Sequence, residues 1–326
     1  MTKNLISVSF LVLVALAIGC SGNRVKPSEP VETVTEALPA SVLKRQIKDV
    51  DFKARLDEKG PKKRIVVLPF VDIGADRPES ARLKAREAFM DELNRSDEII
   101  ALDSNQLKVD VTKYMSGGDY DLAKIAKDSQ NAGVSSLVEG KIIDLRIKKQ
   151  TDKVGIVRNL KTTFEAVVRL RIFNVRSGKE IFHTVKTVAI EDESTRIAER
   201  VSSDLFFINN PELVTILIKD AFLDFTPQLF ESMNVVIWEG RIAALKGEKI
   251  YLNVGRISGV QVGDILKVVE DGSEIYDPEI GYHIGKVSGQ AKGTLEVVSY
   301  FGQDGAVSVI HSGAGFKEND RVELYQ

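Results

Sequence analysis

The sequence has one cysteine, Cys20, no long apolar run after it and almost no excess of charge. One cysteine cannot form a disulfide framework within a chain, and no thiol remains after residue 20 for redox chemistry or a cysteine-ligated metal. No later stretch approaches the roughly 20 consecutive apolar residues that a membrane-spanning helix needs. The formal net charge of −2 argues against a nucleic-acid-binding surface, so we predict no nucleic acid among the partners.

The sequence also lacks the short patterns that carry well-known chemistries. It contains no phosphate-binding loop, dinucleotide fingerprint, nucleophile elbow or H-E-x-x-H pair. His183, His283 and His311 stand far apart in the sequence, so we interpret each as a surface or enclosed histidine and not as a metal ligand or general base. We therefore predict no catalytic residue, no cofactor and no metal, and we expect that the protein is not an enzyme.

Three local clusters also have simpler interpretations than a binding site. Ser116–Asp119 precedes a predicted helix and is interpreted as a loop with a helix cap, in preference to an anion site. Lys62–Arg64 and the basic residues between 148 and 161 are interpreted as solvated edges. One acidic segment has a composition that attracts calcium but misses the EF-hand spacing; it contains Asp271, Glu274, Asp277, Glu279 and His283.

The amino-terminal segment is the most informative part of the sequence. Lys3 precedes the apolar run Leu5–Ile18, and Gly19 stands directly before Cys20. This pattern resembles a bacterial lipoprotein signal, apart from Ala17 three residues before the cysteine, where leucine is commonest. The resemblance implies that residues 1–19 are removed and that Cys20 carries the lipid. The alternatives are an ordinary secretory signal that is cut elsewhere, or a buried free cysteine.

We predict that residues 20–61 form a lipidated flexible tether. This segment is polar and contains Pro27, Pro30 and Pro39. As a coil it would span roughly 35 Å between its ends. The apolar residues within 43–50 recur at helical spacing, which predicts a short amphipathic helix before the first domain.

Residues 62–233 are predicted to form a mixed α/β domain. Ile65–Phe70 is a continuous apolar run that suits a strand covered on both faces. Thr163–Val175 alternates apolar and polar residues and is predicted to pair with Glu180–Ile190 as a long hairpin. Helices should supply the cover, and four segments have helical spacing: Pro78 to Leu93, a segment from Leu122 to Ala126 capped by Asp119, Ile197 to Leu205, and Pro211 to Phe225.

Residues 234–326 are predicted to form a small all-β barrel. Short apolar runs alternate there with glycine-rich turns. Asp264 and Asp320 each stand at a turn just before a strand, where a carboxylate accepts hydrogen bonds from backbone amides. The first of these runs, Val235–Leu245, contains Trp238, which is interpreted as a core or subunit-contact residue in the first barrel strand.

Two parts of the sequence resemble known families. The first resemblance is to the domain shared by the curli-secretion channel CsgG and the N-terminal domain of TolB, and it rests on Arg64–Phe70, Ala132–Gly140 and Arg169–Ile181. The second is to the C-terminal barrel of flagellar assembly protein T, and it rests on Ile250–Gly255, Gly259–Asp264, Asp277–Gly281 and Asn319–Val322. Together they cover roughly residues 62–326. They imply a CsgG/TolB-N-like mixed sheet followed by an SH3-like barrel. Flagellar assembly protein T has a further amino-terminal domain where this chain has the predicted tether.

We expect a non-enzymatic, periplasm-facing lipoprotein that acts as a docking or assembly scaffold. The resemblance implies a setting in the flagellar motor or basal body, or in a secretion machinery. The predicted partners are a membrane, through the lipid on Cys20, and other envelope proteins, with a homo-oligomer left open. Ser21 stands where an aspartate would retain some lipoproteins at the inner membrane, so the predicted location is the inner leaflet of the outer membrane.

Two alternative functions follow from the same sequence. The first is a component of an oligomeric, CsgG-like outer-membrane secretion channel, for which Thr163–Val175 has the alternation of a membrane strand but Lys141–Lys148 is a poor partner. Cover by helices explains the same alternation, and we prefer it. The second is a cell-wall ligand-binding protein or hydrolase, which would need carboxylates brought together in a cleft.

Overall fold

The computed structural model describes residues 60–74, 77–151, 160–192, 203–287 and 289–325, all within one compact unit, Val50–Gln326. The predicted signal segment, Cys20 and all but the last two residues of the predicted tether lie outside the described residues. None of the helices in these ranges is long and apolar enough to cross a bilayer.

A mixed sheet forms the first part of the described chain. Within the described ranges it has six strands in the order β3-β1-β6-β7-β8, with β2 (Val71–Asp72) also paired to β6. The short strand β1 (Lys63–Val67) lies parallel to β3 (Ile99–Asp103) on one side and to β6 (Ser136–Thr151) on the other. The long strands β7 (Leu160–Asn174) and β8 (Lys179–Asp192) continue the sheet in antiparallel pairing. The predicted long hairpin is confirmed.

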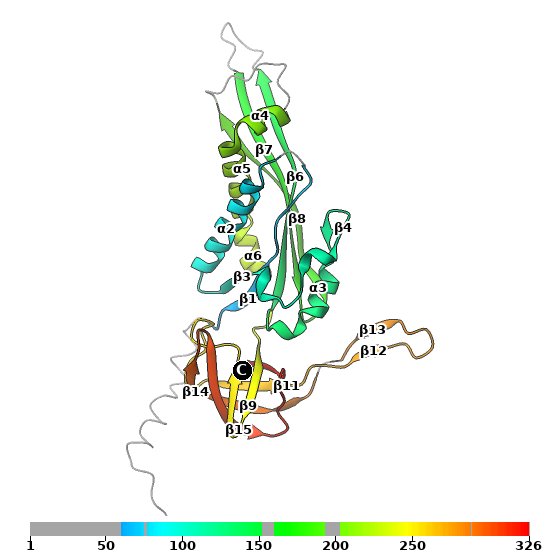
Figure 1. Ribbon diagram of the computed structural model, residues 1–326, viewed down its shortest axis with the longest axis vertical. Coiled ribbons are helices and arrows are strands. Elements are labelled where there is room, and N and C mark those ends of the chain that lie inside the picture. The colour runs from blue at the N-terminus through cyan, green and yellow to red at the C-terminus, as the bar shows by residue number, and fades with distance from the viewer. Residues whose placement is uncertain (1–59, 75–76, 152–159, 193–202, 288, 326) are drawn as a thin grey trace, which may run out of the picture. The chain divides into compact units, whose positions relative to one another are not determined.

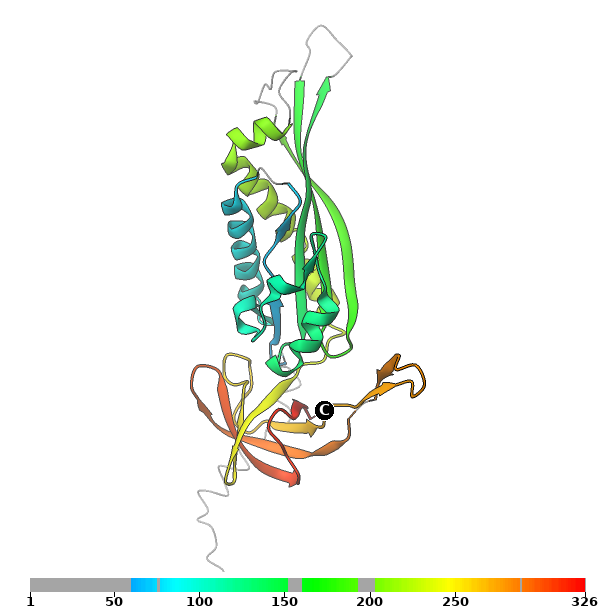
Figure 2. The ribbon, with the colours of Figure 1, turned by 45° about the vertical axis from the view of Figure 1, so that its right-hand side comes forward.

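Helices cover both faces of this sheet (Figures 1 and 2). One core packs α2 (Glu79–Arg95), α5 (Pro211–Leu223) and α6 (Thr226–Met233) against the sheet, and it contains the alternate β7 residues from Phe164 to Ile172. The opposite core packs α3 (Leu122–Asp128). The alternation of β7 is therefore explained by helix cover, as expected. The short helix α4 (Ser203–Asn209) leaves Leu205 53% exposed, while Ile197 and Val201 lie outside the described residues.

The predicted cap of α3 is wrong by two residues. Asp121 is the cap, and its carboxylate accepts a hydrogen bond from the Lys124 amide at 3.1 Å. Asp119 lies instead in a small hairpin, β4 (Met115–Ser116) and β5 (Asp119–Tyr120), whose turn uses Gly117 and Gly118 at positive φ. The Ser116–Asp119 loop is thus the turn of a hairpin. Short 3-10 turns flank it at Ser104–Gln106, Val111–Tyr114 and Gln130–Ala132.

The second part of the chain is a closed barrel, as predicted. Within the described ranges its six strands run in the order β10-β15-β14-β11-β16-β9, and β10 also pairs with β9. They are β9 (Gly240–Lys246), β10 (Lys249–Leu252), β11 (Ile265–Val269), β14 (Ala291–Phe301), β15 (Gly305–Gly313) and β16 (Arg321–Leu324).

Turn chemistry and core packing in the barrel follow the predictions. The Asp264 carboxylate accepts a hydrogen bond from the Gln261 amide at 2.8 Å, and the Asp320 carboxylate accepts one from the Lys317 amide at 2.7 Å. Trp238 packs in the barrel core and is 5% exposed, but it lies two residues before β9 and not within the first strand as predicted.

The basic segment Lys62–Arg64 is not the solvated edge that we predicted. The Lys62 amide donates to the Ser258 carbonyl at 2.9 Å, and the Arg64 guanidinium donates to the Asn253 carbonyl at 2.9 Å. Burial lowers the pKa of Arg64. These hydrogen bonds connect the start of β1 to the barrel, because the residues at the start of β1 pass beside barrel loops that contain Asn253 and Ser258.

Candidate functional site

An apolar arm extends from the barrel between β11 and β14. It consists of β12 (Glu274–Tyr276) and β13 (His283–Lys286), and the two strands pair only with each other within the described ranges. Among its described side chains, six large apolar ones are 42% to 78% exposed: Ile275, Tyr276, Ile280, Tyr282, Ile284 and Val287. An isolated two-stranded hairpin is marginally stable in water, and such a density of exposed apolar side chains marks an interaction surface.

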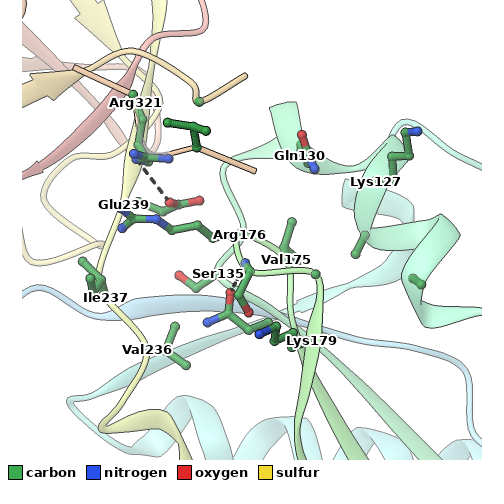
Figure 3. A pocket seen from close by; sticks show the side chains of 18 of the residues that line it. Lys127, Gln130, Ser135, Val175, Arg176, Lys179, Val236, Ile237, Glu239 and Arg321 are labelled. Carbon is green, nitrogen blue, oxygen red and sulfur yellow. Dashed lines mark hydrogen bonds and ion pairs between the residues drawn. The ribbon is translucent and has the colours of Figure 1, made fainter. Parts of the chain in front are cut away.

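A cleft of about 1040 Å³ lies beside the base of the arm. This volume is at the upper end of the range found for small-molecule pockets. The apolar part of its lining comes from the arm and from the segment that precedes β9, where Val235 and Ile237 are 74% and 55% exposed. The cationic part comes from α3 and from the turn between β7 and β8, with Lys127 and Lys179 both exposed. Figure 3 shows Ile237 on one side of this cleft and Lys127 and Lys179 on the other.

A buried cluster of opposite charges forms the floor of the cleft. Glu239 is 2% exposed, and its oxygens lie 3.9 Å from the Arg241 guanidinium and 3.8 Å from that of Arg321. Arg241 donates to Asp271 Oδ2 at 2.7 Å, and Arg176 pairs with Glu323 at 2.9 Å. Burial raises the pKa of Glu239, and the neighbouring arginines offset only part of that effect.

The structure also shows the contacts that two residues of the acidic segment make. Asp271 does not serve as a metal ligand here, because both of its carboxylate oxygens face arginines. Asp277 accepts hydrogen bonds from the amides of Glu279 and Ile280 at 2.9 and 3.1 Å and so shapes the tip of the arm. Among the residues that the structure describes, no group of three or more His, Cys, Asp or Glu could hold a metal ion. The side chains of Glu274 and His283 lie outside the described set.

The remaining histidines are placed at the surface of strands. His183 Nδ1 lies 3.0 Å from Glu180 Oε1 on β8, and His311 Nδ1 lies 3.0 Å from the Thr294 hydroxyl between β15 and β14. The two sites are on different sheets. They do not meet in one constellation, which agrees with the interpretation of isolated histidines.

A second set of buried charges lies on the sheet under the β4–β5 hairpin. Glu139 is fully buried, and its carboxylate accepts a hydrogen bond from Arg171 at 3.0 Å and one from the Tyr120 amide at 3.3 Å. Asp119 bonds to Lys141 and Arg169, each at 2.6 Å. Each carboxylate already has protein partners, so this cluster holds the hairpin on the sheet and leaves no acid aimed into a cavity.

Comparisons with known proteins give little guidance beyond this geometry. No protein-family model matches the chain, and no curated protein matches it. The resemblances to the CsgG/TolB-N domain and to flagellar assembly protein T therefore stay predictions.

Several solved structures are similar to about half of the chain. The hypothetical protein CT253 from Chlamydia trachomatis is 15% identical, with a TM-score of 0.34, over 52% of this chain and 95% of that one. The lipoprotein GNA1162 from Neisseria meningitidis is 11% identical, with a TM-score of 0.26, over 52% and 99%. A PelC dodecamer from Paraburkholderia phytofirmans is 10% identical, with a TM-score of 0.28, over 51% and 92%. Similarity at these scores carries no conclusion about fold or function.

Proposed function

We propose that this protein is a non-enzymatic, lipid-anchored component of the bacterial envelope that docks another envelope protein through its arm and cleft. The lipid would sit on Cys20, as the lipoprotein-like signal implies, and the protein would face the periplasm from the inner leaflet of the outer membrane. A flagellar or secretion assembly is the setting that the family resemblance suggests.

The observation that carries this proposal is the arm itself. Six large apolar side chains are exposed among the described side chains of this two-stranded hairpin. Burying them against a partner removes apolar surface from water and would stabilise a hairpin that is only marginally stable by itself. The adjoining cleft gives that partner a concave surface next to the arm. Among the described residues that line the cleft, Glu239 is the one carboxylate, whereas a typical glycoside hydrolase uses a pair of acids.

The test is site-specific photo-crosslinking in living cells. A photoreactive side chain is placed at Ile284 on the arm or at Ile310 on β15, which is also exposed and does not line the cleft. We expect a discrete adduct with another envelope protein from position 284 and none of the same mass from position 310. Docking through the arm is refuted if the two positions give the same adducts, or if position 284 reacts only with a second copy of this chain.

A further inference from the structure

The strand β8 lies at the edge of the mixed sheet, and in the described part of the chain it pairs with β7 alone. We infer that its open edge pairs with the same edge of a second copy of this chain, in antiparallel order about a two-fold axis perpendicular to the sheet. This inference goes beyond the proposed docking function and does not rest on it, because the residues concerned, Phe182–Asp192, do not line the cleft.

The open edge of β8 is long and regular. The pairing of β8 with β7 is uninterrupted from Phe182 to Asp192, and the register shifts only at the Phe182 end. A strand of this length spans roughly 35 Å. The run contains neither proline nor glycine. Native proteins usually shorten, bend or cover such an edge, because its free amide and carbonyl groups are a template for another strand.

The helices leave this edge incompletely covered. On β7 the apolar side chains that face α2 and α5, from Phe164 to Ile172, are at most 2% exposed. On β8 the side chains that face the same way, including Phe182, Val188 and Ile190, are only partly buried. The proposed two-fold axis keeps both copies the same way up, so the second copy would bring its own β8 and helices to this face and remove these side chains from water.

The charges of β8 favour one register. Opposed residues of a two-fold pair must point to the same face, so each residue faces itself or a residue an even number of positions away. Full overlap of the regular run places Thr187 on the axis, opposite itself, and Val185 opposite Ala189. Lys186 then lies opposite Val188, and no two residues of like charge are opposed. Moving the axis by one position toward the amino terminus would oppose Lys186 to itself, which is unfavourable.

A second copy would satisfy both the backbone and the exposed face of this edge. Every second opposed pair in an antiparallel ladder exchanges two backbone hydrogen bonds, so the full overlap would form about ten of them. Val185 is 51% exposed and would pack against Ala189 across the axis. The same strand in another copy has the length and the charge pattern that this edge requires, so we assign the edge to a second copy of the chain.

Cysteine crosslinking of the full-length protein in membranes tests the pairing. The two copies of residue 187 would lie directly opposite each other, so Thr187→Cys should form a disulfide-linked dimer on mild oxidation. Val185→Cys is the matched control on the same face, because its two copies would lie about 14 Å apart, too far for a disulfide. Both side chains are exposed, so neither change should disturb folding. The parent chain controls for Cys20, its only cysteine.

Light scattering gives a second readout that needs no added cysteine. The parent protein in mild detergent should change from dimer to monomer on dilution. Thr187→Lys opposes two like charges on the axis, so the dissociation constant of the dimer should rise about 3- to 10-fold. Gln303→Lys, in the exposed turn between β14 and β15, is the matched control and should leave the dissociation constant unchanged.

The inference is overturned if the parent protein is a monomer at every concentration, or if Thr187→Cys forms no more linked dimer than the parent chain. It is also overturned if Val185→Cys links as well as Thr187→Cys, or if the two lysine variants dissociate alike. A disulfide from position 187 to a different protein would assign the edge to another partner and would likewise overturn it. Docking through the arm is tested separately at position 284, so either proposal can fail while the other stands.

Discussion

Replacing Arg241 by methionine should destabilise the protein by about 3–5 kcal/mol, the usual cost of removing one member of a buried charged pair. The Arg241 side chain is 6% exposed. Its guanidinium donates to Asp271 Oδ2 at 2.7 Å, to the Asn319 carbonyl at 3.0 Å and to the Gln130 carbonyl at 2.8 Å. Methionine keeps most of the apolar stem, so the loss reports these three hydrogen bonds together with the 3.9 Å ion pair to Glu239. Asp271 keeps only a long contact of 3.5 Å with Arg321.

The assay is urea unfolding followed by the fluorescence of Trp238, the only tryptophan of the chain, which is buried in the barrel core. The matched control is Arg256→Met, because Arg256 lies on the barrel surface 4.8 Å from the Tyr300 ring centre. That change should cost no more than about 1 kcal/mol. A loss below 1 kcal/mol for Arg241→Met would refute the reasoning, since water would then have replaced the three bonds at no cost.

Four further changes test other parts of the structure. Glu239→Gln removes a carboxyl group whose pKa is raised by burial. The folded protein binds the Glu239 proton more tightly than the unfolded chain does, so the parent loses stability as the pH rises. In urea titrations the stability of the glutamine variant relative to the parent should therefore grow as the pH rises above the ordinary pKa of a glutamate, by up to about 1.4 kcal/mol per pH unit, until the folded-state pKa is passed; a constant difference would contradict this. Gly140→Ala would bring a Cβ within 2.5 Å of the Phe70 ring, so we expect a loss of about 1–3 kcal/mol and a lower Tm in calorimetry. Asp264→Ala should cost about 1 kcal/mol through its turn bond, measured by urea unfolding. Cys20→Ala should abolish labelling with radioactive palmitate and release the protein from membranes; persistent labelling would disprove lipidation at this residue.

The regular elements could be predicted because their signals are local. The spacing of Ala81, Ala85, Phe89 and Leu93 predicts α2, and all four side chains are buried on one face of that helix. The alternation in Thr163–Val175 likewise predicts β7. A helix or strand with one buried face has apolar residues at a regular spacing, so this spacing alone predicts the element.

The candidate site was not predictable in the same way. Arg241 contacts Asp271 and Gln130, which lie 30 and 111 positions away in the sequence, so no local pattern marks the cluster. The arm was missed because its strands have three and four residues, too short for alternation to be read. A signal for the arm was present in Asp277–Gly281, whose aspartate and final glycine at positive φ form the turn at its tip.

The junction between β1 and the barrel has a mechanical consequence. Any tension that reaches the protein through residues before Gly60 first meets the Lys62 amide, which is bonded to the Ser258 carbonyl, and then β1. That strand is paired along both edges, to β3 and to β6, so withdrawing it would require two rows of hydrogen bonds to shear together. If Cys20 carries a lipid, as the signal predicts, a pull through the anchor would therefore load the sheet and the barrel first.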